Sequence, residues 1–247
     1  MNAKLKQDIY PDAAGVSLAA AEKIVALAED CVKKTGRFTI ALSGGSTPKN
    51  AYALMVKDPL MKRMPWHASQ FYFGDERHVR PDHPDSNFRM AYESMLHAVP
   101  TENVFPIPTA DPDVNRCAES YESLLRAKFD NSPWPIFDLI LLGLGPDGHT
   151  ASLFPGTPAA NEMTRWVTWS DPAAFNPSIK PPVKRVTITK PVIWNSANVF
   201  VLATGPEKKP ILAKIFSESE PPDPPVSRLL RECKGNVEFF VDRSAVE

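Results

Sequence analysis

The sequence has few cysteines and no long apolar run. Its three cysteines, Cys31, Cys117 and Cys233, lie far apart among 247 residues and form no C-x-x-C pair. A structural zinc motif or a disulfide framework is therefore not expected, and reduced thiols favour a cytoplasmic protein. The N-terminal stretch lacks the apolar core of a signal peptide. No run approaches the ~20 apolar residues that a membrane-spanning helix needs, so we expect no membrane partner.

The sequence also lacks an excess of charge of either sign. The chain carries 28 Lys and Arg against 29 Asp and Glu, a formal net charge of −1. No overall positive field exists to hold nucleic acid, so the cations for any anionic ligand must be gathered locally. The 43% hydrophobic content is typical of soluble globular proteins. The length suits one large domain or two small ones, and we expect a single α/β domain over residues 1–247.

Proline, in contrast, is abundant. The 26 prolines are about twice the usual ~5%. They concentrate in stretches such as 170–182 and 217–227, which lie between apolar segments. We predict that these stretches are ordered surface loops.

Apolar periodicity predicts alternating helices and strands. Ile24, Leu27, Ala28 and Cys31 fall on one face of a helix over 17–35. Further helices are expected from residue 48 and over 86–99, 114–129 and 206–216, and strands over 37–42, 70–73, 137–142, 199–204 and 237–242. This alternation predicts an α/β fold with an open, mostly parallel, doubly wound (Rossmann-like) sheet and helices on both faces.

Polar, mostly glycine-bearing segments follow four of these strands. They read SGGSTP, GDERH, GLGPDGH and TGPEKK. Ligands of open α/β sheets bind outside the carboxyl ends of the strands, near a topological switch point. The four segments are therefore expected to meet at one edge of the sheet and to form a binding site there.

The first segment is a candidate anion site. Its glycines allow close backbone approach, and the following helix offers free N–H groups. The candidate residues are Ser43, Gly44, Gly45, Ser46 and Thr47. An ordinary strand–helix turn capped by Ser or Thr is the alternative. The G-K-[ST] ending of a Walker A loop is missing.

The second segment carries Asp75 and Arg77. Turned inward, the planar guanidinium of Arg77 could hold a carboxylate, a phosphate or an oxyanion; three charges after a strand are more often a solvated loop. Downstream, His83 and Asp85 match no common zinc spacing, so no metal is expected.

Two further cations could reach the same edge. Arg185 follows a proline-rich stretch, and Lys208 opens a helix, where a cation opposes the helix dipole unless a ligand is bound. Together with Arg77, they could neutralise a phosphate of charge near −2.

The third segment offers two interpretations. Gly143, Gly145 and Gly148 match the G-x-G-x-x-G spacing of a dinucleotide-binding turn. That turn needs a following helix, which Pro155 stops after roughly one turn, and no acidic residue follows in register. We therefore expect no nucleotide cofactor.

Within the same turn, Asp147 and His149 are candidate catalytic residues. A histidine at a strand end suits general acid–base work, and a nearby carboxylate can fix its tautomer. The alternative is a histidine that only hydrogen-bonds the loop backbone.

These motifs together resemble the 6-phosphogluconolactonase family. The resemblance rests on ALSGGSTPKNAYALM, FYFGDERHVRPDHPDSNFRMA, FDLILLGLGPDGHTASLFPG, RVTITKPVI and FVLATGPEKKPIL, with GNVEFFVDRSA at the end of the chain. It covers nearly the whole chain and implies hydrolysis of 6-phosphoglucono-1,5-lactone, without metal or cofactor, in the oxidative pentose phosphate pathway. The proline-laden PPDPPVSRL before the last strand departs from the family pattern.

The resemblance also implies a fold similar to that of the glucosamine-6-phosphate deaminases, which are the close alternative. Their pattern D-G-H-I-A-F-N-E-P-G places a glutamate before the proline, where this chain has Phe154. The missing carboxylate favours the lactonase, as does the D-E-R triplet. A non-catalytic sugar-phosphate-binding regulator is a further alternative, although it would not need His149 and Asp147.

For a lactonase, we expect His149 to take a proton from the water that attacks C1, with Asp147 holding its ring. Arg77 or backbone N–H groups would stabilise the oxyanion. The SGGST segment would bind the phosphate, with Arg185 and Lys208 as counter-charges. The sequence leaves open which of the cations holds the phosphate and which serves the carbonyl.

Overall fold

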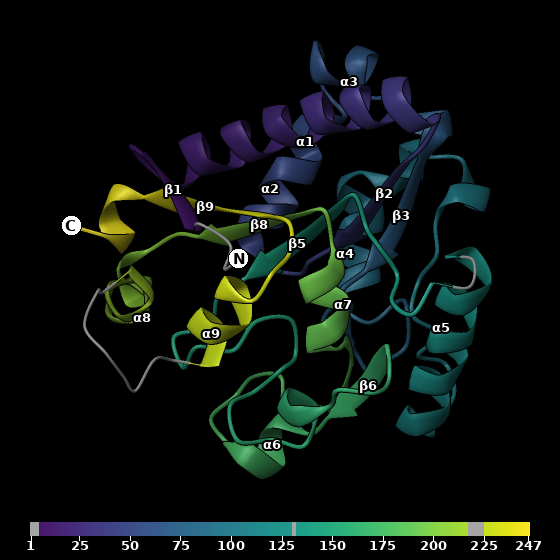
Figure 1. The fold of residues 1–247 in the computed structure, drawn as a ribbon, viewed down its shortest axis with the longest axis vertical. Coiled ribbons are helices and arrows are strands. Elements are labelled where there is room, and N and C mark those ends of the chain that lie inside the picture. Colours follow the sequence, from purple (N-terminus) through teal and green to yellow (C-terminus); the bar gives the residue numbers. More distant parts are fainter. Residues whose placement is uncertain (1–4, 130–131, 217–224) are drawn as a thin grey trace.

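A six-stranded sheet forms the centre of the protein, as Figure 1 shows for the computed structural model, which describes residues 5–129, 132–216 and 225–247. The neighbouring strands are parallel throughout. Their order is β1 (Leu5–Tyr10), β9 (Asn236–Asp242), β8 (Asn198–Ala203), β5 (Leu139–Gly143), β2 (Phe38–Leu42) and β3 (Ser69–Phe73). The prediction of an open, mostly parallel α/β sheet is confirmed.

Helices cover both faces of this sheet. The helices of the described residues are α1 (Ala13–Thr35), α2 (Ser46–Met55), α3 (Leu60–Arg63), α4 (Asn87–Ser94), α5 (Val114–Lys128), α6 (Pro172–Phe175), α7 (Lys190–Asn195), α8 (Lys209–Phe216) and α9 (Pro225–Arg231). In Figure 1, α1 lies on one side of the sheet, and α7 and α9 lie on the other. Strand β9 contacts both layers: Glu238 pairs with Lys23 of α1, and Phe239 packs edge to face on Phe216 of α8.

The chain changes direction in the sheet beside β2. It passes from β2 outward to β3 and then returns to the opposite side of β2 as β5. All five residues of β2 are buried, as expected for a parallel strand covered on both faces. The gap between the loops after β2 and β5 is therefore a topological switch point, where ligands of such folds bind.

A second, three-stranded antiparallel sheet was not predicted from the sequence. Its order is β4 (Asp75–Arg77), β7 (Arg185–Ile188) and β6 (Val167–Ser170). The D-E-R triplet therefore forms a strand and not a solvated loop. The reason is non-local: β4 pairs with β7, more than 100 residues later in the chain, which local periodicity cannot detect.

Other differences are smaller. Strand β1 was not predicted, the helix expected over 86–99 ends at Ser94 before a 3₁₀ turn, and the helix expected over 206–216 begins as a 3₁₀ turn. The proline-rich stretch 170–182 contains the short helix α6. Of the stretch 217–227, residues 217–224 lie outside the described residues, and the remainder belongs to α9.

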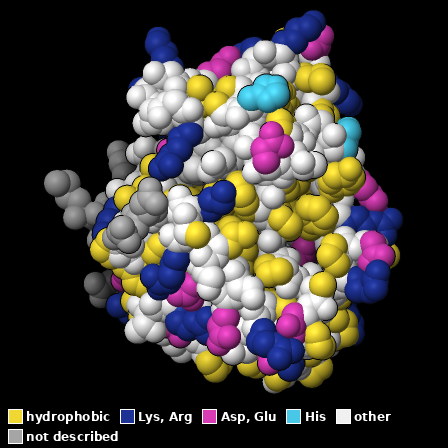
Figure 2. All heavy atoms as spheres, turned by 90° about the vertical axis from the view of Figure 1, so that its right-hand side faces the viewer, with side chains coloured by type: hydrophobic (Ala, Val, Ile, Leu, Met, Phe, Trp, Pro, Cys, Tyr) yellow, Lys and Arg dark blue, Asp and Glu magenta, His cyan; other side chains and the backbone are white. Residues whose placement is uncertain are grey.

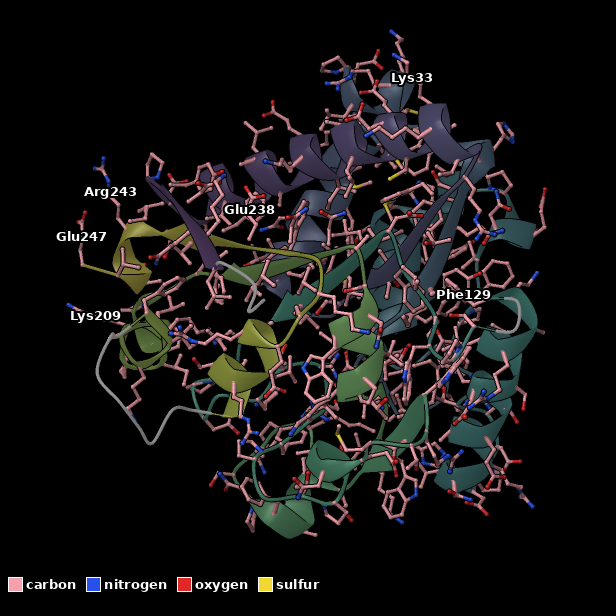
Figure 3. All side chains as sticks on the ribbon, in the orientation of Figure 1. Lys33, Phe129, Lys209, Glu238, Arg243 and Glu247 are labelled. Atoms are coloured by element: carbon pink, nitrogen blue, oxygen red, sulfur yellow. The ribbon has the colours of Figure 1, made fainter. Side chains whose placement is uncertain are left out.

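The surface carries both signs of charge close together. Figure 2 shows basic and acidic side chains interspersed over one face of the molecule. Among the side chains drawn in Figure 3, Lys209 at the start of α8 lies near the C-terminal Glu247, whose carbonyl oxygen accepts a hydrogen bond from Lys209 Nζ. Within the described ranges, no helix has both the length and the apolar content to span a bilayer.

Candidate active site

A cleft of about 230 Å³ opens at the carboxyl edge of the parallel sheet. The loops after β2, β3, β5 and β8 all reach it, so the prediction that four segments meet at one edge is confirmed. Its lining residues are Ser43, Gly44, Gly45, Asp75, Arg77, Asn87, Gly143, Leu144, Gly145, Pro146, His149, Ala151, Arg185 and Lys208. Of the predicted site residues, Ser46, Thr47 and Asp147 do not line it.

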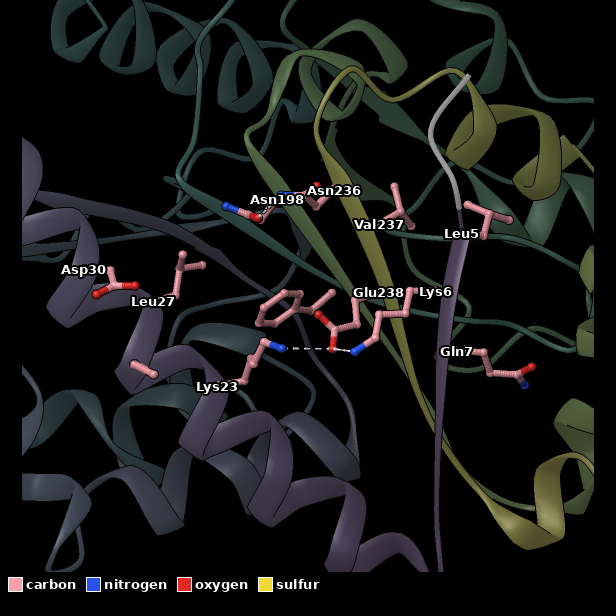
Figure 4. A pocket seen from close by; sticks show the side chains of 12 residues that line it. Leu5, Lys6, Gln7, Lys23, Leu27, Asp30, Asn198, Asn236, Val237 and Glu238 are labelled. Atoms are coloured by element: carbon pink, nitrogen blue, oxygen red, sulfur yellow. Dashed lines mark hydrogen bonds and ion pairs between the residues drawn. The ribbon is translucent and has the colours of Figure 1, made fainter. Parts of the chain in front are cut away.

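A larger hollow lies elsewhere, at the amino ends of β1, β8 and β9 (Figure 4). Its volume is about 790 Å³. The amines of Lys6 and Lys23 both contact Glu238 Oε1 there, at 3.0 and 3.2 Å. Because these cations are already paired, and the predicted motifs are distant, the smaller cleft is the better candidate.

Two buried tyrosines fix the strand ends from which the cleft loops leave. The hydroxyl of Tyr52 donates to the carbonyl of Ser43 at 2.9 Å and accepts from its N–H at 3.0 Å. Tyr121 makes the same pair of contacts with Phe73 at the end of β3. Both loops therefore start from an anchored backbone.

His149 and Asp147 form a tight pair at the mouth of the cleft. The Asp147 Oδ1 atom lies 2.6 Å from His149 Nδ1 and also accepts the His149 backbone N–H. Burial by itself would raise the pKa of Asp147, but the hydrogen bond and charge of His149 outweigh burial and lower that pKa. Asp147 is thus held as a carboxylate, and a proton on Nδ1 leaves His149 Nε2 able to accept another.

Gly145 makes room for this pair. The turn is closed by a hydrogen bond from the Gly145 N–H to the His149 carbonyl, at 2.8 Å. A Cβ atom on Gly145 would collide with the imidazole ring and lie 2.5 Å from Asp147 Oδ1. The glycine is therefore required by the close approach of the two side chains.

Phe154 supports both His149 and Arg185. Its ring centroid lies 4.3 Å from that of His149, and the Arg185 guanidinium lies 5.3 Å from the same ring. Phe154 itself is fully buried. Phe154 thus presents an apolar surface directly to the candidate base His149.

Arg185 is a buried cation. Only 4% of the residue is exposed, and within the described residues no carboxylate lies within 4.0 Å of its guanidinium. Burial lowers the pKa of Arg185, while the nearby Asp75 carboxylate opposes that effect. A buried charge without a paired partner is costly, so this position favours an anionic ligand.

Arg77 is oriented by its neighbours. Its Nη1 donates to the Asn87 side-chain oxygen and to the Asp85 carbonyl. Asn87 in turn donates to the Asp75 carbonyl at 2.9 Å. Arg77 lines the cleft, as the functional interpretation of the D-E-R triplet required.

The phosphate-site candidates divide into two groups. Ser43, Gly44 and Gly45 line the cleft, whereas Ser46 is exposed and Thr47 shares a 2.8 Å hydrogen bond with Thr204 behind it. Lys208 lines the cleft from the 3₁₀ turn Pro206–Lys208, with its amine 3.5 Å from Glu207. Across the described part of the chain, no group of three or more His, Cys, Asp or Glu side chains is arranged to hold a metal ion.

A family model for glucosamine-6-phosphate isomerases/6-phosphogluconolactonase matches residues 11–239. The chain belongs to this family. A Nostoc 6-phosphogluconolactonase is 36% identical over 242 residues, which is 96% of this chain and 95% of the relative. A Synechocystis 6-phosphogluconolactonase is 39% identical over 220 residues, covering 87% of this chain and 86% of the relative.

Solved structures of family members share the fold. The Trypanosoma brucei 6-phosphogluconolactonase matches with a TM-score of 0.88 at 36% identity, covering 98% of this chain and 97% of the other. The Leishmania guyanensis enzyme gives a TM-score of 0.89 at 34% identity, with the same coverage. A monomeric glucosamine-6-phosphate deaminase, 21% identical with a TM-score of 0.78, shares the fold.

Three polar residues of this family member were not among the predicted site residues. Asn87 lines the cleft. Ser152 donates to Asp75 Oδ2 at 2.7 Å. Glu76 is buried and accepts hydrogen bonds from the backbone of Arg77, Asn87 and Phe88 and from the Ser86 hydroxyl.

Ser152 and Glu76 do not line the cleft and support it through these hydrogen bonds, whereas Asn87 lines it directly. Burial raises the pKa of Glu76, and its four hydrogen bonds oppose that rise. In the sequence, these residues are only polar side chains within or beside the predicted motifs. That pattern does not identify their hydrogen-bond partners, because the partners come from other elements.

Proposed function

We propose that this chain hydrolyses 6-phospho-D-glucono-1,5-lactone to 6-phospho-D-gluconate, a step of the oxidative pentose phosphate pathway. The relatives that bear the lactonase name support this assignment. The observation that carries it is one cleft shared by a carboxylate-oriented histidine and a buried arginine that has no carboxylate partner among the residues the structure describes. A phosphorylated lactone needs both a base and a cation.

His149 acts as the general base in this proposal. Asp147 holds Nδ1, so Nε2 takes a proton from the water that attacks the lactone carbonyl carbon C1. The tetrahedral intermediate then collapses, the bond from C1 to the ring oxygen breaks, and His149 returns its proton to that oxygen. The ring opens to the carboxylic acid, which ionises at neutral pH.

Arg77 and the N–H groups of the glycine turns stabilise the developing oxyanion. Asn87 and the Asp85 carbonyl hold the Arg77 guanidinium in place before substrate binds, and such preorganised donors are worth most in a cleft that excludes water. Arg185, Lys208 and the backbone of Ser43–Gly45 bind the phosphate.

Phe154 favours this reaction over amino-sugar deamination. It packs 4.3 Å from the His149 ring, at the sequence position where the deaminase pattern has a glutamate. An apolar ring cannot relay a proton to or from the histidine. The contact therefore suits a general base, His149, whose ring is oriented by Asp147 without a second carboxylate.

Three substrates assayed in parallel test the proposal. We expect turnover of the phosphorylated lactone above its spontaneous hydrolysis, a higher KM for unphosphorylated gluconolactone, and no ammonia release from glucosamine 6-phosphate. Ammonia release would favour a deaminase, and binding of 6-phosphogluconate without turnover would favour a regulator. The cytoplasmic location, the single domain and the lack of nucleic-acid and membrane partners stay predictions.

A further inference from the structure

Arg77, Arg185 and Ser170 form one row across the three-stranded sheet. Arg77 of β4 lies opposite Arg185 of β7, and Arg185 lies opposite Ser170 of β6. Directly opposite residues of antiparallel strands project to the same face, with Cβ atoms about 4.5–5.5 Å apart. Ser170 is therefore the immediate neighbour of Arg185, on the face that carries both cleft arginines.

The same three residues hold unsatisfied polar atoms. Across the described residues, the buried side-chain nitrogen and oxygen atoms without a hydrogen-bond partner are Arg77 Nε, Arg185 Nε and Ser170 Oγ. Ser170 is 3% exposed and Arg185 is 4% exposed. A buried polar atom without a partner destabilises the fold, so the collection of three such atoms in one row beside the cleft calls for a functional explanation.

The two neighbouring atoms of Ser170 and Arg185 are chemically complementary. The Nε–H group of an arginine can only donate, whereas a serine hydroxyl can also accept. The Arg185 guanidinium is held by the Phe154 ring and by a long contact of 3.4 Å from Nη2 to the Lys180 carbonyl. Neither contact uses Nε, so this atom is available to Ser170.

Ser170 pairs with Arg185 across the sheet but does not line the cleft. Arg185 lines the cleft, whereas Ser170 lines a separate hollow of about 480 Å³ together with Thr168, Trp169 and Phe175. A hydroxyl in this place can act on the phosphate only through the arginine. It is also bordered by space that could accept one extra methyl group.

We propose that Ser170 is the positioning residue for Arg185. When a phosphate draws the guanidinium into the cleft, Ser170 Oγ accepts a hydrogen bond from Arg185 Nε, which directs the Nη groups at the anion. One contact satisfies two unpartnered atoms, and the bound phosphate offsets the loss of the Lys180 contact. This inference rests on the proposed function, because it assigns Arg185 to the phosphate of the lactone.

Kinetics of Ser170 variants test the proposal. We expect Ser170→Ala to raise KM for the phosphorylated lactone roughly 10- to 20-fold, the low end of the effect of losing a hydrogen bond to a charged group. Its kcat and its KM for unphosphorylated gluconolactone should stay at the wild-type values. Ser170→Thr keeps the hydroxyl and should restore the wild-type KM. Thr168→Ala removes a hydroxyl from the same strand and face and should change neither constant.

A double-mutant cycle isolates the contact. Arg185→Lys removes the Nε donor while keeping the charge, so Ser170→Ala should have no further effect in that background. Additive effects would contradict the proposal, as would equal changes for both lactones or a Ser170→Thr variant as weak as Ser170→Ala. Thermal unfolding of each variant checks that the fold is retained.

Calorimetric titration with 6-phosphogluconate separates this proposal from the lactonase assignment. The Kd for this compound should rise in Ser170→Ala and not in Thr168→Ala, whether or not the wild-type chain turns over the lactone. An inactive wild-type chain contradicts the lactonase assignment. An unchanged Kd in Ser170→Ala contradicts the role of Ser170.

Discussion

Replacing Gly145 with alanine tests the His149–Asp147 pair without removing either side chain. The new Cβ would lie 2.5 Å from Asp147 Oδ1, and ordinary van der Waals contact begins near 3.4 Å. The pair must therefore move by about 1 Å, and a misplacement of that size costs about 10²-fold in rate. Gly145 does not adopt a left-handed backbone conformation, so the substitution adds no backbone strain.

The assay measures kcat for the phosphorylated lactone, together with the midpoint of thermal unfolding. We expect kcat to fall about 10²-fold while the folded state is retained. Gly74→Ala is the matched control, because its Cβ would meet the Leu42 carbonyl at an ordinary 3.5 Å. A folded Gly145→Ala variant with wild-type kcat would refute the role assigned to the pair.

Three other predictions concern charge. Arg185→Ala should raise KM for the phosphorylated lactone by about 10- to 100-fold, through loss of charge-assisted hydrogen bonds, and should spare unphosphorylated gluconolactone; equal effects on both would argue against phosphate binding. Asp147→Asn should lower kcat by about 10²-fold or more, because an amide can stabilise the wrong tautomer of His149. An unchanged kcat in steady-state assays would contradict the proposal that Asp147 orients the His149 ring. The hydrogen bonds that Glu162 accepts from Thr164 and Arg165 lower the pKa of its carboxyl from 4.5 to about 2. These bonds therefore stabilise the fold fully above pH 4.5. Their contribution to stability is lost as the pH falls toward 2. Thermal unfolding should therefore show Glu162→Gln to be less stable than wild type at pH 7, with a gap that narrows below pH 4.5; a gap independent of pH would contradict this reasoning.

The parallel sheet could be predicted because its signals are local. Strands such as β2 are short apolar runs buried on both faces, and helices such as α1 repeat apolar residues every three or four positions. The location of the cleft also followed, since the carboxyl ends of parallel strands share one edge.

The small antiparallel sheet could not be predicted because its signals are non-local. Glu76 reads as a solvated charge, yet it is buried because Ser86, Asn87 and Phe88 supply its hydrogen bonds. Arg185 becomes a neighbour of Ser170 only through the register of β6 and β7. The local sequence pattern identifies neither the hydrogen-bond partners of Glu76 nor the register in which the strands pair.

The close packing of side chains in the cleft could not be predicted from the sequence either. Gly44 lies against the Asn87 side chain so closely that a Cβ there would overlap it. The sequence indicates a glycine that allows backbone approach to a ligand. It does not indicate that a side chain of the same protein occupies part of that space.

The rate of 6-phosphogluconolactone hydrolysis by wild type and by His149→Ala is the most direct test of the central claim. Both rates are compared with spontaneous hydrolysis in the same buffer, at saturating substrate. The proposed mechanism predicts clear acceleration by the wild type and a kcat lowered by about 10²-fold or more in the variant. A wild-type rate equal to the spontaneous one would contradict the lactonase assignment. A His149→Ala variant with undiminished kcat would contradict the general-base role.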